Sequence, residues 1–287
     1  MNSQSKYDQR FSFEFFPPKT EVGVEKLKVV QQELAARKPS FFSVTYGAGG
    51  STRDRTYDTV MDVQQGTGIC TAPHLSCVGD TKKQLAELLQ QYKDNGINRI
   101  VALRGDLPSG MGASLGELKY ASDLVRFIRD QTGDHFHIEV AAYPEMHPQA
   151  QGMKADLNAF KTKVEAGASS AITQYFFNID AYKFFIDSCE KMGLDLPIVP
   201  GIMPITHYQN LVRFSASCGA EIPRWLQHSL ADWGDDTEGL RQFGVEVVAR
   251  LCERLLAGGA PGLHFYTLNQ AEATADILRR IGFAAAH

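Results

Sequence analysis

Short apolar runs rich in β-branched and aromatic residues alternate along the chain with longer stretches in which apolar residues recur every three or four positions. The short runs predict strands and the longer stretches predict amphipathic helices. The predicted strands cover residues 11–16, 41–45, 70–76, 99–104, 137–143, 171–176, 197–202 and 263–266. The predicted helices cover residues 22–37, 52–65, 81–95, 118–131, 153–166 and 179–192, a long region before the last strand, and residues 270–281.

This order predicts eight consecutive βα units. Strands joined by helical crossovers run parallel, and eight of them close into a (β/α)8 TIM barrel of the α/β class. A doubly wound open sheet is the competing architecture. The strand count and the lack of any linker favour a single barrel domain over residues 1–287, with a polar N-terminal tail at residues 1–10. Residues 216–239 would add helical material between the seventh and eighth strands.

Composition narrows the class of protein. The hydrophobic content of 44%, the charged content of 22% and the net charge of −4 describe a soluble globular protein with no electrostatic reason to bind nucleic acid or a membrane. The polar N-terminus lacks a signal peptide, and no segment reaches the length of a membrane span, so we expect a cytoplasmic protein. Five cysteines without a Cys-x-x-Cys pair indicate reduced thiols rather than zinc ligands or disulfides.

Glu14 is the single carboxylate in the aromatic run FSFEFF at residues 11–16. An ionised, unpaired carboxylate in apolar surroundings costs several kcal/mol. Such surroundings raise the pKa of a carboxyl group, which would make Glu14 a proton donor near neutral pH. Glu14 is therefore a candidate catalytic acid. The alternative is a structural carboxylate that accepts hydrogen bonds from a neighbouring turn or pairs with a buried arginine.

Polar or glycine-bearing sequences follow every predicted strand. Active sites of TIM barrels lie at the carboxyl ends of the strands, so these residues are expected to meet at one ligand site. They are Glu14, residues 45–50, His74, residues 104–106, residues 143–147, Gln174, residues 201–204 and Tyr266. The glycines in residues 45–50 would let the backbone approach a ligand, with a plain tight turn as the alternative. No Gly-x-Gly-x-x-Gly or Walker lysine motif is present, which argues against a Rossmann site or a P-loop.

Asp106 is a second strand-end carboxylate, beside Arg104. The neighbouring cation should lower the pKa of Asp106 and keep it ionised, whereas the pKa of Glu14 is expected to rise. That divergence would assign separate roles to the two carboxyl groups. A purely structural pairing of Arg104 with Asp106 is the alternative. His74 and His147 lack the i+4 partner or carboxylate triad of a metal site, so no metal is expected.

Eight motifs in sequence order resemble the bacterial methylenetetrahydrofolate reductases, from residue 11 to about residue 281. The motifs are FEFFPPK, VTYGAGGSTRD, APHLSC, LRGD, AAYPEMHP, ITQYFF, PGIMP and HFYTLN. The resemblance implies a FAD-bearing (β/α)8 barrel that reduces 5,10-methylenetetrahydrofolate to 5-methyltetrahydrofolate with NADH or NADPH, supplying methyl groups for methionine synthesis. It also implies a short form without a C-terminal regulatory domain and without inhibition by adenosylmethionine.

The resemblance implies a role for each matching residue. Glu14 matches the general acid that opens the folate methylene bridge to an iminium ion, and Asp106 matches the carboxylate near the flavin and the pterin. The implied FAD contacts are Thr45, Tyr46, Ala48, His74, Arg104, Gly105, Asp106, Tyr120, Ala121, Tyr143, His147, Asp156 and Lys163. Thr45 would approach the flavin N5, and Lys163 and His147 suit the diphosphate or ribose. The implied substrate residues are Gln174, Asn210, Phe214, Tyr266 and Gln270, although core packing is the ordinary role of a helical aromatic such as Phe214.

Because a flavin in a barrel mouth offers one accessible face, NADH and folate are expected to alternate on it in a ping-pong mechanism. The resemblance favours NADH, and a homo-oligomer is the ordinary expectation. Two positions depart from the family pattern, since Gln270 stands where arginine is common and Asn210 where glutamine is usual. The rival interpretations are a different flavin barrel, such as a proline dehydrogenase-like enzyme, and a barrel that binds folate or nucleotide without turnover.

Overall fold

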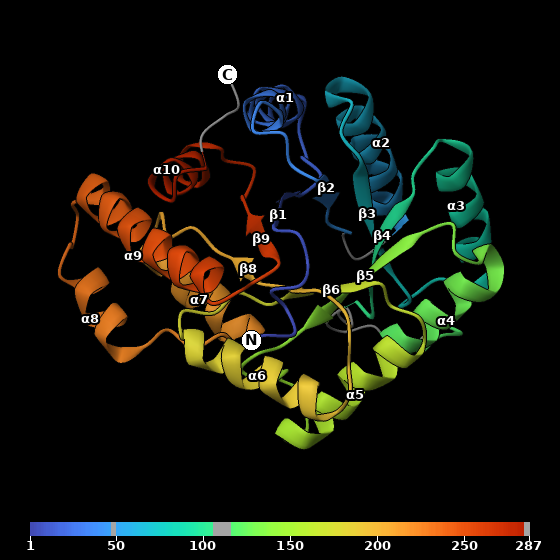
Figure 1. Ribbon diagram of the computed structural model, residues 1–287. Coiled ribbons are helices and arrows are strands. Elements are labelled where there is room, and N and C mark those ends of the chain that lie inside the picture. The colour runs from blue at the N-terminus through green and yellow to red at the C-terminus, as the bar shows by residue number, and fades with distance from the viewer. Residues whose placement is uncertain (47–49, 106–115, 284–287) are drawn as a thin grey trace.

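The computed structural model describes residues 1–46, 50–105 and 116–283, and its helices form a ring around a central set of strands (Figure 1). The strands are β1 (Arg10–Phe15), β2 (Phe41–Val44), β3 (Thr71–Ser76), β4 (Arg99–Leu103), β5 (His137–Ala142), β6 (Ser170–Thr173), β7 (Ile198–Val199), β8 (Gly201–Ile202) and β9 (Gly262–Tyr266). The helices are α1 (Glu21–Ala35), α2 (Gly50–Thr67), α3 (Lys82–Asp94), α4 (Ala121–Thr132), α5 (Met153–Glu165), α6 (Ile179–Lys191), α7 (Tyr208–Cys218), α8 (Arg224–Ala231), α9 (Thr237–Ala257) and α10 (Glu272–Arg280).

The strands pair in the order β7-β6-β5-β4-β3-β2-β1-β9-β8, and every pair is parallel. The two ends of this order, β7 and β8, are halves of the predicted seventh strand, divided at Pro200. Proline has no N–H to donate to a strand ladder, which explains the division. Since β7 pairs with β6 and β8 pairs with β9, the ring closes through this interrupted strand. The predicted (β/α)8 barrel is confirmed, and the open doubly wound sheet is excluded.

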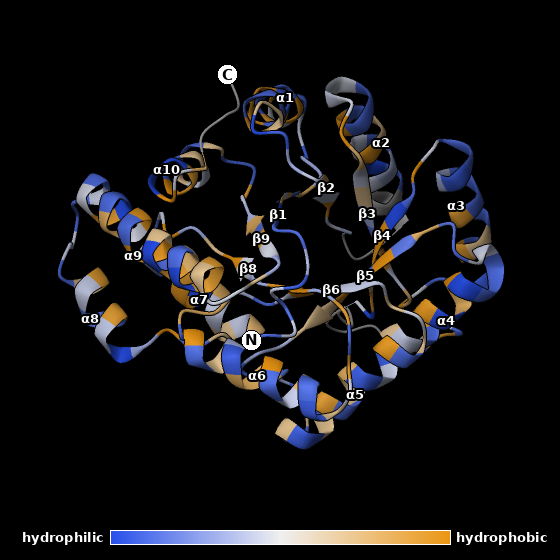
Figure 2. Cartoon of the chain, in the orientation of Figure 1, coloured by the Kyte–Doolittle hydropathy of each residue, from blue (hydrophilic) through white to orange (hydrophobic). Residues whose placement is uncertain are grey.

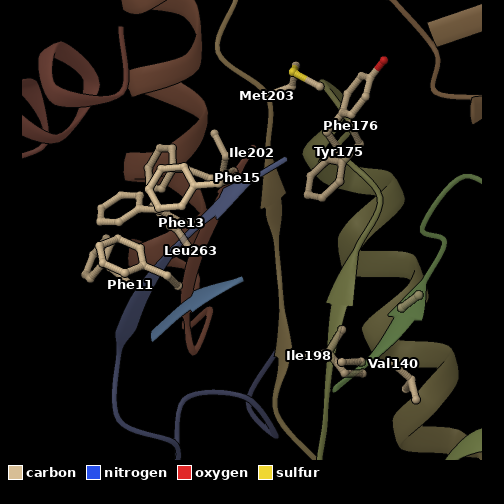
Figure 3. Close-up of a cluster of buried hydrophobic side chains, with 14 of the residues drawn as sticks. Phe11, Phe13, Phe15, Val140, Tyr175, Phe176, Ile198, Ile202, Met203 and Leu263 are labelled. Atoms are coloured by element: carbon tan, nitrogen blue, oxygen red, sulfur yellow. The ribbon is translucent and has the colours of Figure 1, made fainter. Parts of the chain in front are cut away.

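Side chains of β1 alternate between two different environments. Phe11, Phe13 and Phe15 are buried in the main apolar core, and Figure 3 shows them on the same side of the strand. Because successive strand residues point to opposite faces, Ser12 and Glu14 point the other way, into the barrel. The helices supply the outer half of the main core. Apolar and polar residues alternate along α4, α5, α6 and α9 in Figure 2, as expected for helices with one face against the strands.

The barrel interior contains a second, smaller apolar cluster. Phe41, Ala72, Val101 and Ile172 pack together there, each from a different strand. The cluster joins β2, β3, β4 and β6 through the middle of the barrel. The interior at this level is therefore filled with side chains, as in other TIM barrels.

The N-terminal segment predicted as a polar tail is docked on the barrel. Gln4 is buried, donates a hydrogen bond from Nε2 to the carbonyl of Leu196 at 3.2 Å and accepts one from the N–H of Ile198 at 2.8 Å. Tyr7 donates to Asp195 at 2.8 Å. The N-terminal amine lies 3.9 Å from Asp187 of α6, and Figure 1 shows the N-terminus beside that helix. These contacts supply a partner for the first N–H of the short β7.

Extra helical material does lie between the last two barrel strands, where residues 216–239 were expected to provide it. It consists of α8 and the turns around it. Within the described ranges, no helix is both long and apolar enough to cross a lipid bilayer.

Candidate active site

Glu14 lies at the carboxyl end of β1, beside Ser43 of β2 and Tyr266 of β9 in the strand register. Its Oε2 atom lies 3.2 Å from Nε2 of His74 and 3.4 Å from Nε2 of His264. The side chain is 15% exposed, so the carboxylate is screened from water but not sealed off. Two imidazoles thus converge on one carboxylate oxygen.

The pKa of Glu14 moves opposite to the sequence-based prediction. Burial by itself raises this pKa, but the charge of His74 and the hydrogen bond from His264 outweigh burial and lower it from 4.5 to about 2. The prediction of a raised pKa was wrong because it counted the neighbouring phenylalanines as the environment of Glu14. Those rings project from the other face of β1, whereas Glu14 shares its own face with polar groups.

His264 is fully buried, and its ring is fixed on several sides. Its Nδ1 atom lies 2.7 Å from Oγ of Ser12, and its Nε2 atom makes the contact with Glu14. The ring stacks on Phe41 with centroids 5.9 Å apart and meets Tyr266 edge-on at 5.4 Å. Ser12 and His264 were not among the residues predicted from the sequence. The available signal was the two-residue strand period, since each precedes a site residue of its strand by two positions.

The backbone that follows Glu14 is anchored by the segment after β9. Thr267 donates from Oγ1 to the Glu14 carbonyl at 2.6 Å. Asn269 accepts from the N–H of Phe16 at 3.0 Å and donates to its carbonyl at 2.8 Å. Asn269 has a positive φ of 56°, a conformation that asparagine tolerates better than most residues. The HFYTLN motif therefore positions the FEFF motif.

A chain of polar contacts connects four of the predicted cofactor residues at the carboxyl ends of β4 and β5. Arg104 donates to Oε1 of Gln149 at 2.5 Å, and the N–H of Gln149 donates to Nδ1 of His147 at 3.0 Å. The N–H of His147 donates to Oδ2 of Asp156 at 2.8 Å, and the charge of Asp156 acts on Lys163. Gln149 was not predicted as a site residue, because nothing in its local sequence separates it from an ordinary loop glutamine.

The ammonium group of Lys163 donates a hydrogen bond to the carbonyl of Ala141 at 2.5 Å. Burial lowers its pKa from 10.5 to about 8, and the charge of Asp156 only partly opposes this effect. Tyr143 contacts the His147 ring edge-on, with centroids 4.5 Å apart. The arrangement would gain from an anionic group near Lys163, because such a group would stabilise the ammonium ion.

Gly105 must be glycine for two separate reasons. Its φ is +85°, in the region that favours glycine, and a Cβ atom would lie 2.0 Å from Oγ of Ser76. That hydroxyl donates to the Arg104 carbonyl at 2.8 Å. The end of β4 is thereby held against the end of β3.

The remaining predicted cofactor residues lie outside the polar chain that runs from Arg104 to Lys163. Thr45 follows β2 with its N–H bonded to the Phe15 carbonyl at 2.9 Å, and Tyr46 donates to Asp80 at 3.2 Å. Tyr120 is exposed at the start of α4, next to Ala121. Asp106 and Ala48 lie outside the described residues.

The predicted substrate residues divide into two groups. Tyr266 donates to the Thr173 carbonyl at 2.7 Å and, with Gln270, borders a small pocket. Gln174 borders a second small pocket together with Tyr143, at the ends of β5 and β6. These residues lie at the same end of the barrel as Glu14.

Asn210 and Phe214 lie on α7. Asn210 is exposed and accepts a hydrogen bond from Arg213 at 3.1 Å, and the Arg213 guanidinium lies 5.6 Å from the centre of the half-buried Phe214 ring. Neither residue makes a recorded contact with the Glu14 group in the described parts of the chain. Their helix does reach the barrel, because Ser215 lies 3.0 Å from the Tyr175 hydroxyl.

A metal centre is not apparent in what the structure describes. Among those residues, no group of three or more His, Cys, Asp or Glu side chains is arranged to hold a metal ion.

Solved structures with a similar fold are remote in sequence. An uncharacterized protein from Clostridium thermocellum, which binds two copies of 5-methyl-5,6,7,8-tetrahydrofolic acid, has a TM-score of 0.65 at 19% identity, over 98% of this chain and 97% of that one. An oxaloacetate acetylhydrolase has a TM-score of 0.54 at 11% identity, over 98% of this chain and 85% of that one. At such identities the likeness shows the barrel fold alone.

Relatives much closer in sequence share one name. The family described as methylenetetrahydrofolate reductase matches residues 1–282. The 5,10-methylenetetrahydrofolate reductases of Buchnera aphidicola subsp. Acyrthosiphon pisum and Escherichia coli K12 are 42% and 41% identical over 271 residues, which is 94% of this chain and 91% and 90% of theirs. Methylenetetrahydrofolate reductase (NADH) 1 of Zea mays is 39% identical over 95% of this chain and 48% of its own length. The chain belongs to the methylenetetrahydrofolate reductase family, a family of oxidoreductases in folate one-carbon metabolism.

Proposed function

We propose that this protein reduces 5,10-methylenetetrahydrofolate to 5-methyltetrahydrofolate with FAD as cofactor and NADH or NADPH as reductant. The observation that carries the proposal is the carboxylate of Glu14, held by two imidazoles at the active-site end of a barrel of this family. The Clostridium thermocellum protein supports a folate ligand for this barrel shape, since it binds 5-methyltetrahydrofolate itself.

The residues at the barrel mouth fit FAD. Arg104, His147 and Lys163 are cations or hydrogen-bond donors linked in one polar chain, as a diphosphate requires. Gly105 has no side chain, so a ligand can approach the backbone closely beside these residues. Tyr46 after β2 and Tyr143 after β5 offer aromatic surfaces at the carboxyl ends of their strands. Bound FAD supplies the hydride that the folate carbon receives.

The protein's own contribution is acid catalysis and positioning. A proton delivered by Glu14 to N10 of the folate lets the bond between the methylene carbon and N10 break, with the electron pair left on N10. The carbon then remains on N5 as an iminium ion, and addition of a hydride converts it to the methyl group. Tyr266 donates to the carbonyl of Thr173, the residue before Gln174, so both side chains are suited to hold the pterin beside this acid.

The expected reductant is NADH, because the name of the maize relative specifies NADH. NADH and folate would use the same face of the cofactor in turn, giving ping-pong kinetics and a product that serves methionine synthesis. The cytoplasmic location and the homo-oligomeric state stay predictions.

An anaerobic titration of the purified protein tests this function. The protein is expected to be yellow, to lose its flavin absorbance on addition of NADH, and to regain it with methylenetetrahydrofolate. Parallel titrations with NADPH decide the reductant. A colourless protein that takes up no FAD would contradict the proposal. Bleaching by proline would favour the proline dehydrogenase-like alternative, and folate binding without folate-dependent NADH oxidation would favour a binding protein.

A further inference from the structure

Glu145 is a half-buried carboxyl group in the turn that follows β5, and the proposed reaction does not use it. Its Oε1 atom is buried and has no hydrogen-bond partner among the described residues. Burial, together with the charge of Glu221, raises the pKa of the group above its usual value, so the surroundings disfavour an ionised carboxylate. A buried polar atom without a partner costs free energy, and such a group needs an explanation.

The other oxygen of Glu145 supplies the explanation. Its Oε2 atom accepts a hydrogen bond from the N–H of Glu221 at 2.8 Å, and the two residues are 76 positions apart in the sequence. Glu221 belongs to the loop between α7 and α8, residues 219–223. Glu145 therefore joins the turn after β5 to the loop that follows α7.

Two further contacts hold the end of α7 against the barrel. Gly219, the first residue after α7, has a φ of +76°, and a Cβ atom there would lie 2.8 Å from Cγ of Pro148. The buried Tyr175, two residues beyond β6, has its hydroxyl 3.0 Å from Oγ of Ser215 in the last turn of α7. The end of α7 thus rests on the segments that follow β5 and β6.

The backbone beside Glu145 shows how firmly its turn is held. Met146 has a φ of +91°, which is unfavourable for a residue with a side chain. Such a conformation persists only where contacts around it determine it. Glu145 on one side bonds to the α7 loop, and the N–H of His147 on the other side donates to Asp156 of α5 at 2.8 Å. The turn is therefore a fixed point to which α7 can be attached.

The two segments that Glu145 joins carry different sets of expected ligand contacts. The turn after β5 contains Tyr143 and His147, which are expected to contact FAD. Helix α7 carries Asn210 and Phe214, which are expected to contact the folate. Because α7 is a continuous helix of 11 residues, the position of its end determines where both of these side chains lie.

We propose that Glu145 is a positioning residue for the folate, an inference that rests on the proposed function. By holding the end of α7 against the turn after β5, Glu145 sets the place of Phe214 and Asn210 at the mouth of the barrel. It contacts neither folate nor FAD in this role, and no proton passes through it. Since its partner is a backbone N–H and its surroundings disfavour ionisation, the role requires an acceptor oxygen rather than a negative charge.

The test follows reoxidation of the reduced flavin at increasing methylenetetrahydrofolate concentrations, by anaerobic stopped flow. Glu145→Ala is expected to raise the half-saturating folate concentration about tenfold, the effect of about one lost hydrogen bond, while the limiting rate and FAD affinity stay close to wild type. Glu145→Gln keeps an acceptor oxygen and should behave like wild type. Glu190→Ala is the matched control, because Glu190 on α6 also accepts from a distant backbone N–H, that of Ser3, at 3.1 Å.

Labelling of Cys218 with a thiol reagent measures the position of α7 without any turnover. Cys218 is half-buried and lines the small cavity between α7 and the turn after β5, whereas the half-buried Cys70 precedes β3 at the other end of the barrel. Glu145→Ala should speed the labelling of Cys218 relative to that of Cys70. Gly219→Ala, which disturbs the same contact from the α7 side through Pro148, should have the same two effects.

A Glu145→Ala protein with wild-type folate saturation and wild-type Cys218 labelling would overturn the inference. So would a Glu145→Ala protein that loses FAD affinity but keeps wild-type folate saturation, since Glu145 would then support only its own turn. A Glu145→Gln protein as impaired as Glu145→Ala would contradict the role of the acceptor oxygen. If the wild-type protein fails to bind FAD or to reduce the folate, the proposed function has failed, and Cys218 labelling still decides whether Glu145 holds α7.

Discussion

Oε2 of Glu14 lies 3.4 Å from Nε2 of His264, although 250 positions separate the two residues along the chain. They meet because β1 pairs with β9, the pairing that joins the first and last strands of the barrel. The contact between the Glu14 carboxylate and the His264 imidazole therefore forms only when the barrel is closed. A change that opens the β1–β9 pairing should therefore both destabilise the fold and separate Glu14 from His264.

Glu139 is expected to contribute strongly to stability. It is buried, pairs with Arg99 and accepts from Ser170 at 2.5 Å. Burial alone raises its pKa, but the hydrogen bond from His137 and the charge of Arg99 lower it to about 2. Glu139→Gln would leave Arg99 without its counter-ion and should lower the free energy of unfolding by about 3–5 kcal/mol at pH 7, measured by urea denaturation.

The sign of the pH dependence follows from the same pKa. The folded-state pKa of Glu139 lies below its ordinary value of 4.5, so its contribution is present above pH 4.5 and is lost as pH falls towards 2. The difference between wild type and Glu139→Gln should therefore shrink over that range. Glu165→Gln, which breaks only a surface pair with Lys161, is the control and should change stability by less than about 1 kcal/mol. An equal loss for Glu139→Gln at pH 7 and pH 3 would contradict the assignment.

Gln4→Ala tests the docked N-terminal segment. The change leaves the N–H of Ile198 and the carbonyl of Leu196 without their partners, which should cost about 1–3 kcal/mol in urea denaturation. Gln90→Ala on the exposed face of α3 removes a glutamine of the same size and should change little. Equal effects of the two substitutions would show that the segment does not support β7.

Gly105→Ala should destabilise the protein and weaken FAD binding, because a Cβ atom there would lie 2.0 Å from Oγ of Ser76. Gly133→Ala is the matched control, since Gly133 also has a positive φ but has open space at the Cβ position. In Gly133→Ala the free energy of unfolding should fall by only about 1 kcal/mol, the cost of placing alanine at a positive φ. Adding Ser76→Ala should recover part of the loss at Gly105 and nothing at Gly133. Thermal denaturation and FAD titration measure both effects.

Lys163 predicts how FAD affinity depends on pH. Its pKa is about 8, and a diphosphate nearby would raise it, so binding above pH 8 requires proton uptake. FAD affinity should be constant below pH 8 and fall as pH rises above it. Lys163→Met should bind FAD more weakly and lose this dependence, whereas Lys161→Met, on the same helix but paired with Glu165, should keep it. Fluorescence titration at several pH values decides between these outcomes.

The sequence predicted the barrel well because its signals are local. Strand and helix patterns alternate eight times, and the parallel closure follows from that alternation. Pro200 divided one predicted strand into β7 and β8 without changing its place in the barrel. The ends of the elements moved by a few residues, as for α4, which begins at Ala121 rather than near residue 118.

The candidate site was predicted less completely, because its electrostatics depend on contacts across the barrel. The residues at strand ends were found from their positions, but Ser12, Gln149 and His264 act through partners that only the fold brings near. The pKa of Glu14 was predicted in the wrong direction for the same reason. Its sequence neighbours are aromatic, while its spatial neighbours are imidazoles.

The two half-reactions of Glu14→Gln test the central claim most directly. The variant should bind FAD and be reduced by NADH at the wild-type rate, because Glu14 takes no part in that step. Reoxidation by methylenetetrahydrofolate should slow by at least about 10²-fold, since the amide cannot deliver a proton to N10. A Glu14→Gln protein that reduces methylenetetrahydrofolate at the wild-type rate would contradict the account.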